Sequence, residues 1–86
     1  MTLDEKFEDA QRRVKTLPTM PPQDVLLELY GLYKQGSTGD VTGSRPGMLD
    51  FKGRAKYDAW ASRRGMTADA AKEKYVALVD RLAGVK

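Results

Sequence analysis

Hydrophobic residues recur every three or four positions through four stretches of this chain, and no stretch shows the strict alternation of a strand. The first stretch opens with Thr2-Leu3-Asp4-Glu5, a capping-box sequence in which the Thr2 and Glu5 side chains each accept a free backbone N–H. Pro18 ends this helix. Its hydrophobic positions are Leu3, Phe7, Ala10, Val14 and Leu17.

The second helix is predicted from about Pro22 to Gln35, with Gly36 as its C-terminal stop. Its hydrophobic band is wider than a surface helix needs, which indicates that this helix packs in a core and also lines a second feature of the molecule. The band consists of Val25, Leu26, Leu29, Leu32 and Tyr33, with Leu27 and Tyr30 beside them.

Residues 36–50 form one long loop rich in Gly, Ser, Thr and Asp, and a loop of this length in so small a chain is often functional. The third helix is predicted from Asp50 to Arg64. Thr67 then caps a fourth from Ala68 to Ala83. The expected core face of the third helix is Phe51, Ala55 and Ala59, with Met48 and Leu49 packed beneath its start. That of the fourth is Ala71, Tyr75, Leu78, Val79 and Leu82.

Four helical segments in 86 residues predict one all-α domain, residues 1–86, folded as a four-helix bundle. The long loop between the second and third helices allows the chain to travel back, so that these two helices can run parallel. Periodicity alone does not choose this topology.

The composition argues against catalysis. The chain has no cysteine and no histidine, which removes the commonest nucleophile, general base and transition-metal ligands. The net charge of +3 is uneven, because residues 44–86 carry ten basic and five acidic side chains while residues 1–43 carry five and seven. A basic half predicts an anionic partner: nucleic acid, membrane lipid or a phosphorylated metabolite. A merely solvated basic face is the plainer alternative.

Tyrosines and lysines form the candidate site. Tyr30, Tyr33 and Lys34 share one helical face, and so do Lys52 and Lys56. With Tyr75 from the fourth helix, they could converge on a flat base and several phosphates. On spacing alone, core tyrosines and solvated lysines are the simpler interpretation. Arg45 is either a phosphate ligand or a loop staple, and its place beside Pro46-Gly47 favours the structural role. Asp40, Asp50 and Asp58 are more simply interpreted as turn, helix-cap and surface residues than as catalytic carboxylates.

Three blocks carry a specific resemblance: YGLYKQG at 30–36, RPGML at 45–49 and FKGRAKYDAW at 51–60. They resemble the acyl-CoA-binding protein family, whose members are small four-helix carriers. The resemblance covers about residues 7–75. It implies up-down-down-up topology and a non-enzymatic protein that binds, transports and buffers medium- to long-chain fatty acyl-CoA, with no cofactor or metal.

The resemblance also implies roles for residues at the coenzyme A end of the ligand. Tyr30, Lys34 and Lys56 are expected to hold the ribose 3′-phosphate, and Lys15 to supplement them. Tyr33 is expected to pack against the adenine, with Tyr75 as its neighbour.

The acyl tail is expected to lie along Leu26, Leu27 and Leu29, beside Phe7 and Gln11, with Lys52 near its path. Two residues depart from the family pattern. Gln11 stands where a small alanine is usual, which could narrow the acyl groove, and Tyr57 stands where a tryptophan is usual. Trp60 follows the pattern.

Two alternatives from other classes remain open at this stage. One is a nucleic-acid-binding helical domain, although Gly53 would interrupt its recognition helix. The other is a protein-interaction bundle with Val25 to Leu32 as its seam. The hydrophobic runs are too short to span a membrane and the acidic N-terminus is unlike a signal peptide, so we expect a soluble, cytoplasmic monomer. The family interpretation expects no nucleic acid partner. It leaves open transient contact with acyl-CoA-using enzymes or a membrane surface.

Overall fold

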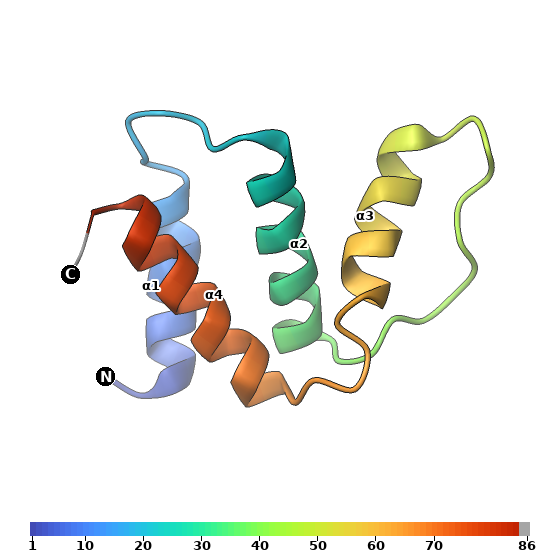
Figure 1. The fold of residues 1–86 in the computed structure, drawn as a ribbon. Helices are drawn as coiled ribbons and strands as arrows, with labels where there is room; N and C mark the ends of the chain where they lie inside the picture. The colour runs from blue at the N-terminus through green and yellow to red at the C-terminus, as the bar shows by residue number, and fades with distance from the viewer. Residues whose placement is uncertain (85–86) are drawn as a thin grey trace.

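The computed structural model describes residues 1–84, and these contain four α-helices and no strand. The helices are α1 (Leu3–Val14), α2 (Gln23–Ser37), α3 (Phe51–Ala61) and α4 (Ala68–Leu82). α2 and α3 run in the same direction, opposite to α1 and α4 (Figure 1). The all-α, up-down-down-up prediction is therefore confirmed.

Side-chain caps fix three of the helix starts. In α1 the Thr2 N–H donates to Glu5 Oε1 at 3.0 Å and the Glu5 N–H donates to Thr2 Oγ1 at 3.2 Å, which is the predicted capping box. Asp50 accepts from the Gly53 N–H, and Thr67 from the Ala70 N–H.

Three predicted helix ends are wrong. α1 ends at Val14, before the predicted stop at Pro18, α3 ends at Ala61 instead of Arg64, and α2 continues through Gly36 to Ser37. Gly36 is buried, and a Cβ there would lie 3.2 Å from the Phe7 ring and 3.1 Å from the Lys72 side chain. This glycine therefore allows close packing inside the helix, where the sequence had predicted a helix stop.

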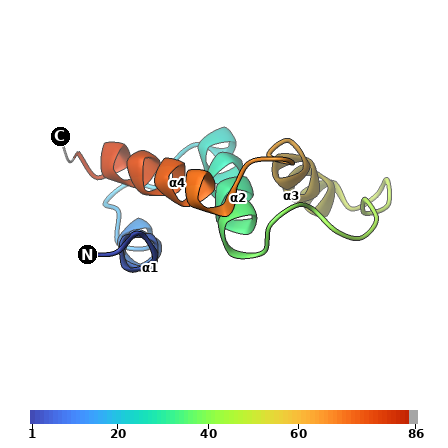
Figure 2. The same cartoon turned by 90° about the horizontal axis from the view of Figure 1, so that it is seen from below.

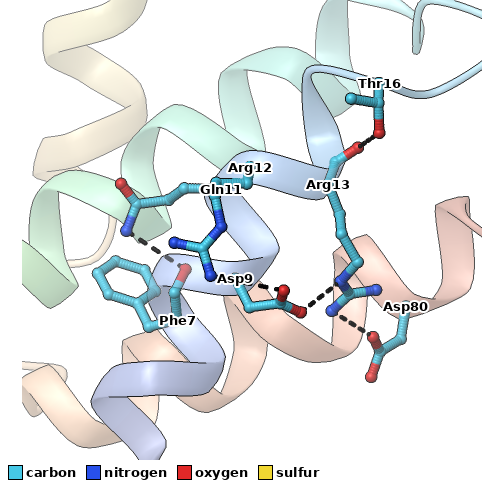
Figure 3. A network of polar contacts seen from close by, with 7 residues as sticks. All are labelled: Phe7, Asp9, Gln11, Arg12, Arg13, Thr16 and Asp80. Atoms are coloured by element: carbon cyan, nitrogen blue, oxygen red, sulfur yellow. Dashed lines mark hydrogen bonds and ion pairs between the residues drawn. The ribbon is translucent and has the colours of Figure 1, made fainter.

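The core lies among α1, α2 and α4. It consists of Phe7, Ala10, Leu29, Leu32, Tyr75, Leu78 and Val79. α4 packs closely against both α1 and α2, whereas α1 and α2 are farther apart and meet through side chains, such as Phe7 with Tyr33 and Gly36. An ion pair of 2.8 Å between Arg13 Nη2 and Asp80 Oδ1 also joins α1 to α4 (Figure 3).

α3 stands outside this core. It packs on α2 alone, on the side of α2 away from α1 and α4 (Figure 2). The predicted core face of the third helix is therefore wrong at Phe51, which is 77% exposed, and beneath its start at Met48 and Leu49, which are 77% and 92% exposed. Its other members, Ala55 and Ala59, are half-buried, and Ala59 faces α2. The residue that α3 buries is Trp60, nine positions after the start of the helix.

Gly31 on α2 sets the distance between α2 and α3. A Cβ at this position would collide with the backbone carbonyl of Ala59 on α3. Because the obstructing atom belongs to backbone, no side-chain rotation could relieve the collision. The two helices can therefore approach this closely only with glycine at position 31.

We expect Gly31→Ala to lower the free energy of unfolding by about 1–3 kcal/mol, because overpacking against a fixed backbone outweighs the better helix propensity of alanine. Urea unfolding followed by circular dichroism would measure the loss. Gly47→Ala is the matched control, since a Cβ there meets nothing within 4 Å. Equal stability of the two variants would show that Gly31 does not set the helix separation.

Candidate functional site

A cavity of about 300 Å³ opens between the first turns of α2 and α3. It is lined by Met20, Gln23, Leu26, Leu27, Tyr30, Lys52 and Lys56. Apolar side chains of α2 and of the segment before it form one wall, and two lysines of α3 form the other. We call this the α2–α3 cavity. It brings together five of the residues predicted from the sequence: Leu26, Leu27, Tyr30, Lys52 and Lys56.

The helical register explains this lining. Leu26 and Tyr30 are four residues apart on α2, and Lys52 and Lys56 are four apart on α3, so each pair presents one face. The parallel course of α2 and α3 places these faces opposite each other along the same turns. The Lys56 Nζ lies 5.4 Å from the centre of the Tyr30 ring, which leaves a cation beside an aromatic face.

Lys15 lies in an adjoining cleft. That cleft is lined by Val14, Lys15, Leu17, Met20, Pro21 and Leu26. Since Met20 and Leu26 also line the α2–α3 cavity, Lys15 borders that cavity from the α1 side.

Lys34 pairs with a residue that sequence reasoning left without a role. Its Nζ lies 4.8 Å from the centre of the Trp60 ring on α3. The Trp60 indole N–H donates to the Gly39 carbonyl at 2.7 Å, which fixes the ring under Lys34. The spacing Lys52, Lys56, Trp60, at four-residue steps on one helical face, is the signal that could have linked Trp60 to this site.

Tyr33 lies in a separate cleft between α1 and α2. Its ring stacks near Phe7 with centroids 6.1 Å apart, and Gln11 lines the same cleft. The Gln11 amide turns back along α1 and donates to the Phe7 carbonyl at 3.3 Å (Figure 3). Phe7 and Gln11 therefore meet Tyr33, not Leu26 and Leu27 as expected, because α1 runs opposite to α2 and its early turns lie beside the end of α2 (Figure 1).

Two further predicted site residues belong to the core. Leu29 is 5% exposed, so it does not form a groove wall. Tyr75 is 4% exposed, and its ring meets Phe7 edge-on with centroids 5.1 Å apart. Burial raises the pKa of the Tyr75 hydroxyl, and the nearby Tyr33 adds to the shift. The structure thus places Tyr75 behind Tyr33.

Asp40 fastens the start of the long loop. Its Oδ1 accepts from the Gln35 amide at 2.8 Å and from the Gly65 N–H at 2.9 Å. Gln35 is almost fully buried and also donates to the Met66 carbonyl. This network joins the end of α2 to the α3–α4 junction beside Gly39, the residue that holds Trp60.

Contacts farther along hold the rest of the loop against α3. Arg45 makes a bidentate pair with Asp58, at 2.9 Å from Nε and 2.7 Å from Nη2. The Tyr57 hydroxyl donates to the Gly43 carbonyl at 3.1 Å. Arg45 therefore has the structural role that the sequence favoured, and the phenol at position 57 has a specific partner.

Asp40, Asp50 and Asp58 each accept a structural hydrogen bond, from Gln35, Gly53 and Arg45 respectively. Within residues 1–84 no group of three or more Asp and Glu side chains could hold a metal ion. In the same range, no helix is both long and apolar enough to cross a membrane.

Comparisons with a family model, with curated relatives and with solved structures all lead to the same family. Residues 4–79 match the family described as "Acyl CoA binding protein". Acyl-CoA-binding protein homolog 1 of Caenorhabditis elegans is 52% identical over 82 residues, covering 95% of this chain and 93% of the relative. Acyl-CoA-binding protein of Saccharomyces cerevisiae is 45% identical over 76 residues, with 88% and 87% covered. The crystal structure of Oryza sativa Acyl-CoA-Binding Protein 2 superposes with a TM-score of 0.92 at 40% identity, covering 96% of this chain and 92% of that one.

The Asp40 network predicts a pH-dependent stability. The Gly65 N–H, then the Gln35 amide and the Arg64 charge, hold the pKa of Asp40 below its ordinary value. A carboxylate whose pKa is lower in the native than in the unfolded state stabilises the fold at pH values above the unfolded-state pKa. This stabilisation is lost as the pH falls through the native-state pKa. We expect Asp40→Asn to unfold at a lower temperature than wild type at neutral pH. Its unfolding temperature should also fall less than that of wild type on acidification from about pH 5 to about pH 2.

Thermal unfolding at a series of pH values tests this expectation. Thr42→Ala, at an exposed position of the same loop, is the matched control and should keep the wild-type dependence on pH, because it removes no titratable group. If Asp40→Asn and wild type keep the same difference at every pH, the Asp40 carboxylate does not stabilise the fold through its charge.

Proposed function

Since the chain belongs to the acyl-CoA-binding protein family, a family of non-enzymatic carriers, we propose that it binds medium- to long-chain fatty acyl-CoA thioesters, transports them and buffers their free concentration. The observation that supports this function best is the α2–α3 cavity, where an apolar wall faces two ammonium groups. Such a cavity suits a ligand with an apolar tail and an anionic nucleotide.

The nucleotide end is assigned to the tyrosines and lysines. We assign the 3′-phosphate to Tyr30, Lys34 and Lys56. Lysine is a flexible point charge suited to a phosphate monoester. The Nζ atoms of Lys34 and Lys56 lie 4.8 Å and 5.4 Å from the centres of aromatic rings, and each flexible side chain can turn from its ring to a phosphate oxygen. Lys15, beside the adjoining cleft, would supplement them.

The adenine is assigned to Tyr33. This ring is 37% exposed and Phe7 and Tyr75 support it from the core, so a flat face is available for stacking. Tyr75 contributes to this assignment as support behind Tyr33.

The acyl tail is assigned to Leu26 and Leu27. The stem of Lys52 can cover apolar groups while its ammonium stays in water. Leu29, beneath them in the core, fixes the helix that carries this wall. Gln11 and Phe7 lie in the neighbouring cleft with Tyr33, so the larger side chain at position 11 acts on the part of the ligand next to the adenine.

The whole chain is proposed to act as one acyl-CoA-binding domain without a cofactor. That it works as a cytoplasmic monomer, with transient contacts to acyl-CoA-using enzymes, stays a prediction from the sequence.

Titration calorimetry with free coenzyme A, octanoyl-CoA and palmitoyl-CoA at fixed ionic strength tests the function. We expect affinity to rise with chain length, by at most about 0.8 kcal/mol per buried CH₂, until the cavity is full. Higher salt should weaken all three ligands, because each carries the same charged nucleotide. Equal weak binding of all three would contradict an acyl-binding wall.

Lys34→Ala and Lys56→Ala should each weaken palmitoyl-CoA binding by about ten- to a hundredfold, as expected for a lost hydrogen bond to a charged group. Calorimetry gives the affinities and circular dichroism the fold. Lys74→Ala, which removes an exposed lysine of α4 outside the cavities described, is the matched control. Wild-type affinity in both site variants would show that the phosphate is held elsewhere.

A further inference from the structure

The long loop ends in an apolar turn. The Asp50 N–H donates to the Gly47 carbonyl at 3.0 Å, so Met48 and Leu49 occupy the two corners of a tight turn directly before α3. Corner positions of turns favour Gly, Pro, Asn, Asp and Ser. Here they hold two large apolar side chains, and both stand in solvent together with Phe51, the first residue of α3. We call Met48, Leu49 and Phe51 the apolar tip.

The tip is held in place from both sides. The bidentate Arg45–Asp58 pair fixes the chain before the turn to α3, and the Asp50 carboxylate caps the helix directly after it. An apolar group that is fixed in an exposed position has already lost the conformational freedom that binding would otherwise remove. Exposed apolar patches of this kind mark interaction sites.

The tip lies at the same end of the molecule as the mouth of the α2–α3 cavity. α2 and α3 both begin at this end, and the connector that contains Met20 crosses it (Figure 1). Met20 is 79% exposed and lines the cavity. Lys52, the residue after Phe51, also lines the cavity. Apolar side chains and lysines therefore surround one opening.

The charge around the tip is positive. Lys52, Arg54 and Lys56 follow it on α3. Two acidic residues lie at this end of the molecule: Asp50, whose carboxylate accepts the Gly53 N–H, and Asp24 in the first turn of α2. Two components bind a protein to an anionic lipid surface: apolar side chains that enter the boundary between headgroups and acyl chains, and lysines that are attracted to the anionic headgroups.

We propose that the apolar tip is a docking element for anionic bilayers, which brings the mouth of the α2–α3 cavity against the lipid surface. A projecting turn fits a fluid lipid surface better than it fits a preformed protein groove. The biological purpose, exchange of an acyl ligand with the bilayer, rests on the proposed function. The docking itself does not, because the apolar side chains that would enter the bilayer, Met48, Leu49 and Phe51, do not line the cavity.

Vesicle flotation of the ligand-free protein tests the docking. We compare phosphatidylcholine vesicles with vesicles that also contain phosphatidylserine, at low and high salt. The wild type should float with the anionic vesicles, less so at high salt, and should stay in solution with phosphatidylcholine alone. The double variant Leu49→Ser/Phe51→Ser should lower the partition coefficient by roughly tenfold, because two apolar side chains that would enter the bilayer are removed.

Thr42→Ala/Ser44→Ala is the matched control, since it alters exposed positions in the same loop without removing an apolar group, and it should float like wild type. Unchanged flotation of Leu49→Ser/Phe51→Ser would overturn the proposal. So would a wild-type chain that stays in solution with both kinds of vesicle, in which case a protein partner is the occupant to test for the tip.

Calorimetry of the same double variant with palmitoyl-CoA, without vesicles, separates the two proposals. We expect wild-type affinity, because neither residue lines the cavity. If the wild type floats but does not bind palmitoyl-CoA, the proposed function fails and the docking stands. If it binds palmitoyl-CoA but does not float, only the docking fails.

Discussion

The close approach of α3 to α2 at Gly31 is the constraint on which the site depends. α3 has no contact with the core, so its position is set by this one helix pair and by the loop that precedes it. Lys52, Lys56 and Trp60 all reach α2 from α3. A wider separation would remove one wall of the cavity and both cation–aromatic contacts, while the core among α1, α2 and α4 would stay closed. Stability and binding are thus divided between two halves of the molecule.

The loop between α2 and α3 makes this arrangement rigid. Asp40 and Gln35 fasten its beginning, and Arg45 and Tyr57 fasten its later part to α3. A parallel helix pair needs a long connection, and an unrestrained connection would leave α3 free to shift along α2. The polar residues of this loop therefore position the lysines without touching the cavity. They also present the apolar tip at its mouth.

Lys34 and Lys56 lie over the aromatic rings of Trp60 and Tyr30. Within residues 1–84 neither forms an ion pair with a carboxylate, so these rings hold their charges near the cavity. Lys72 differs, because its Nζ pairs with Asp4 at 2.6 Å and that contact raises its pKa. Lys72 therefore fastens α4 to α1, whereas Lys34 and Lys56 are the lysines proposed to meet a ligand.

The sequence by itself determined the four helices, most of their ends and the residue types of the site. Local spacing and capping act within a few residues, so Thr2, Asp50 and Thr67 could be recognised directly. The short blocks around Tyr30 and Lys56 also indicated the family and its topology. Only the tertiary structure decided which faces meet. It placed α3 on α2 alone, left Phe51 in solvent, buried Gln35, and moved Gln11 to the cleft beside Tyr33. These outcomes depend on contacts between residues far apart in the chain, and a periodic pattern gives the direction of a helix face without naming what lies opposite it.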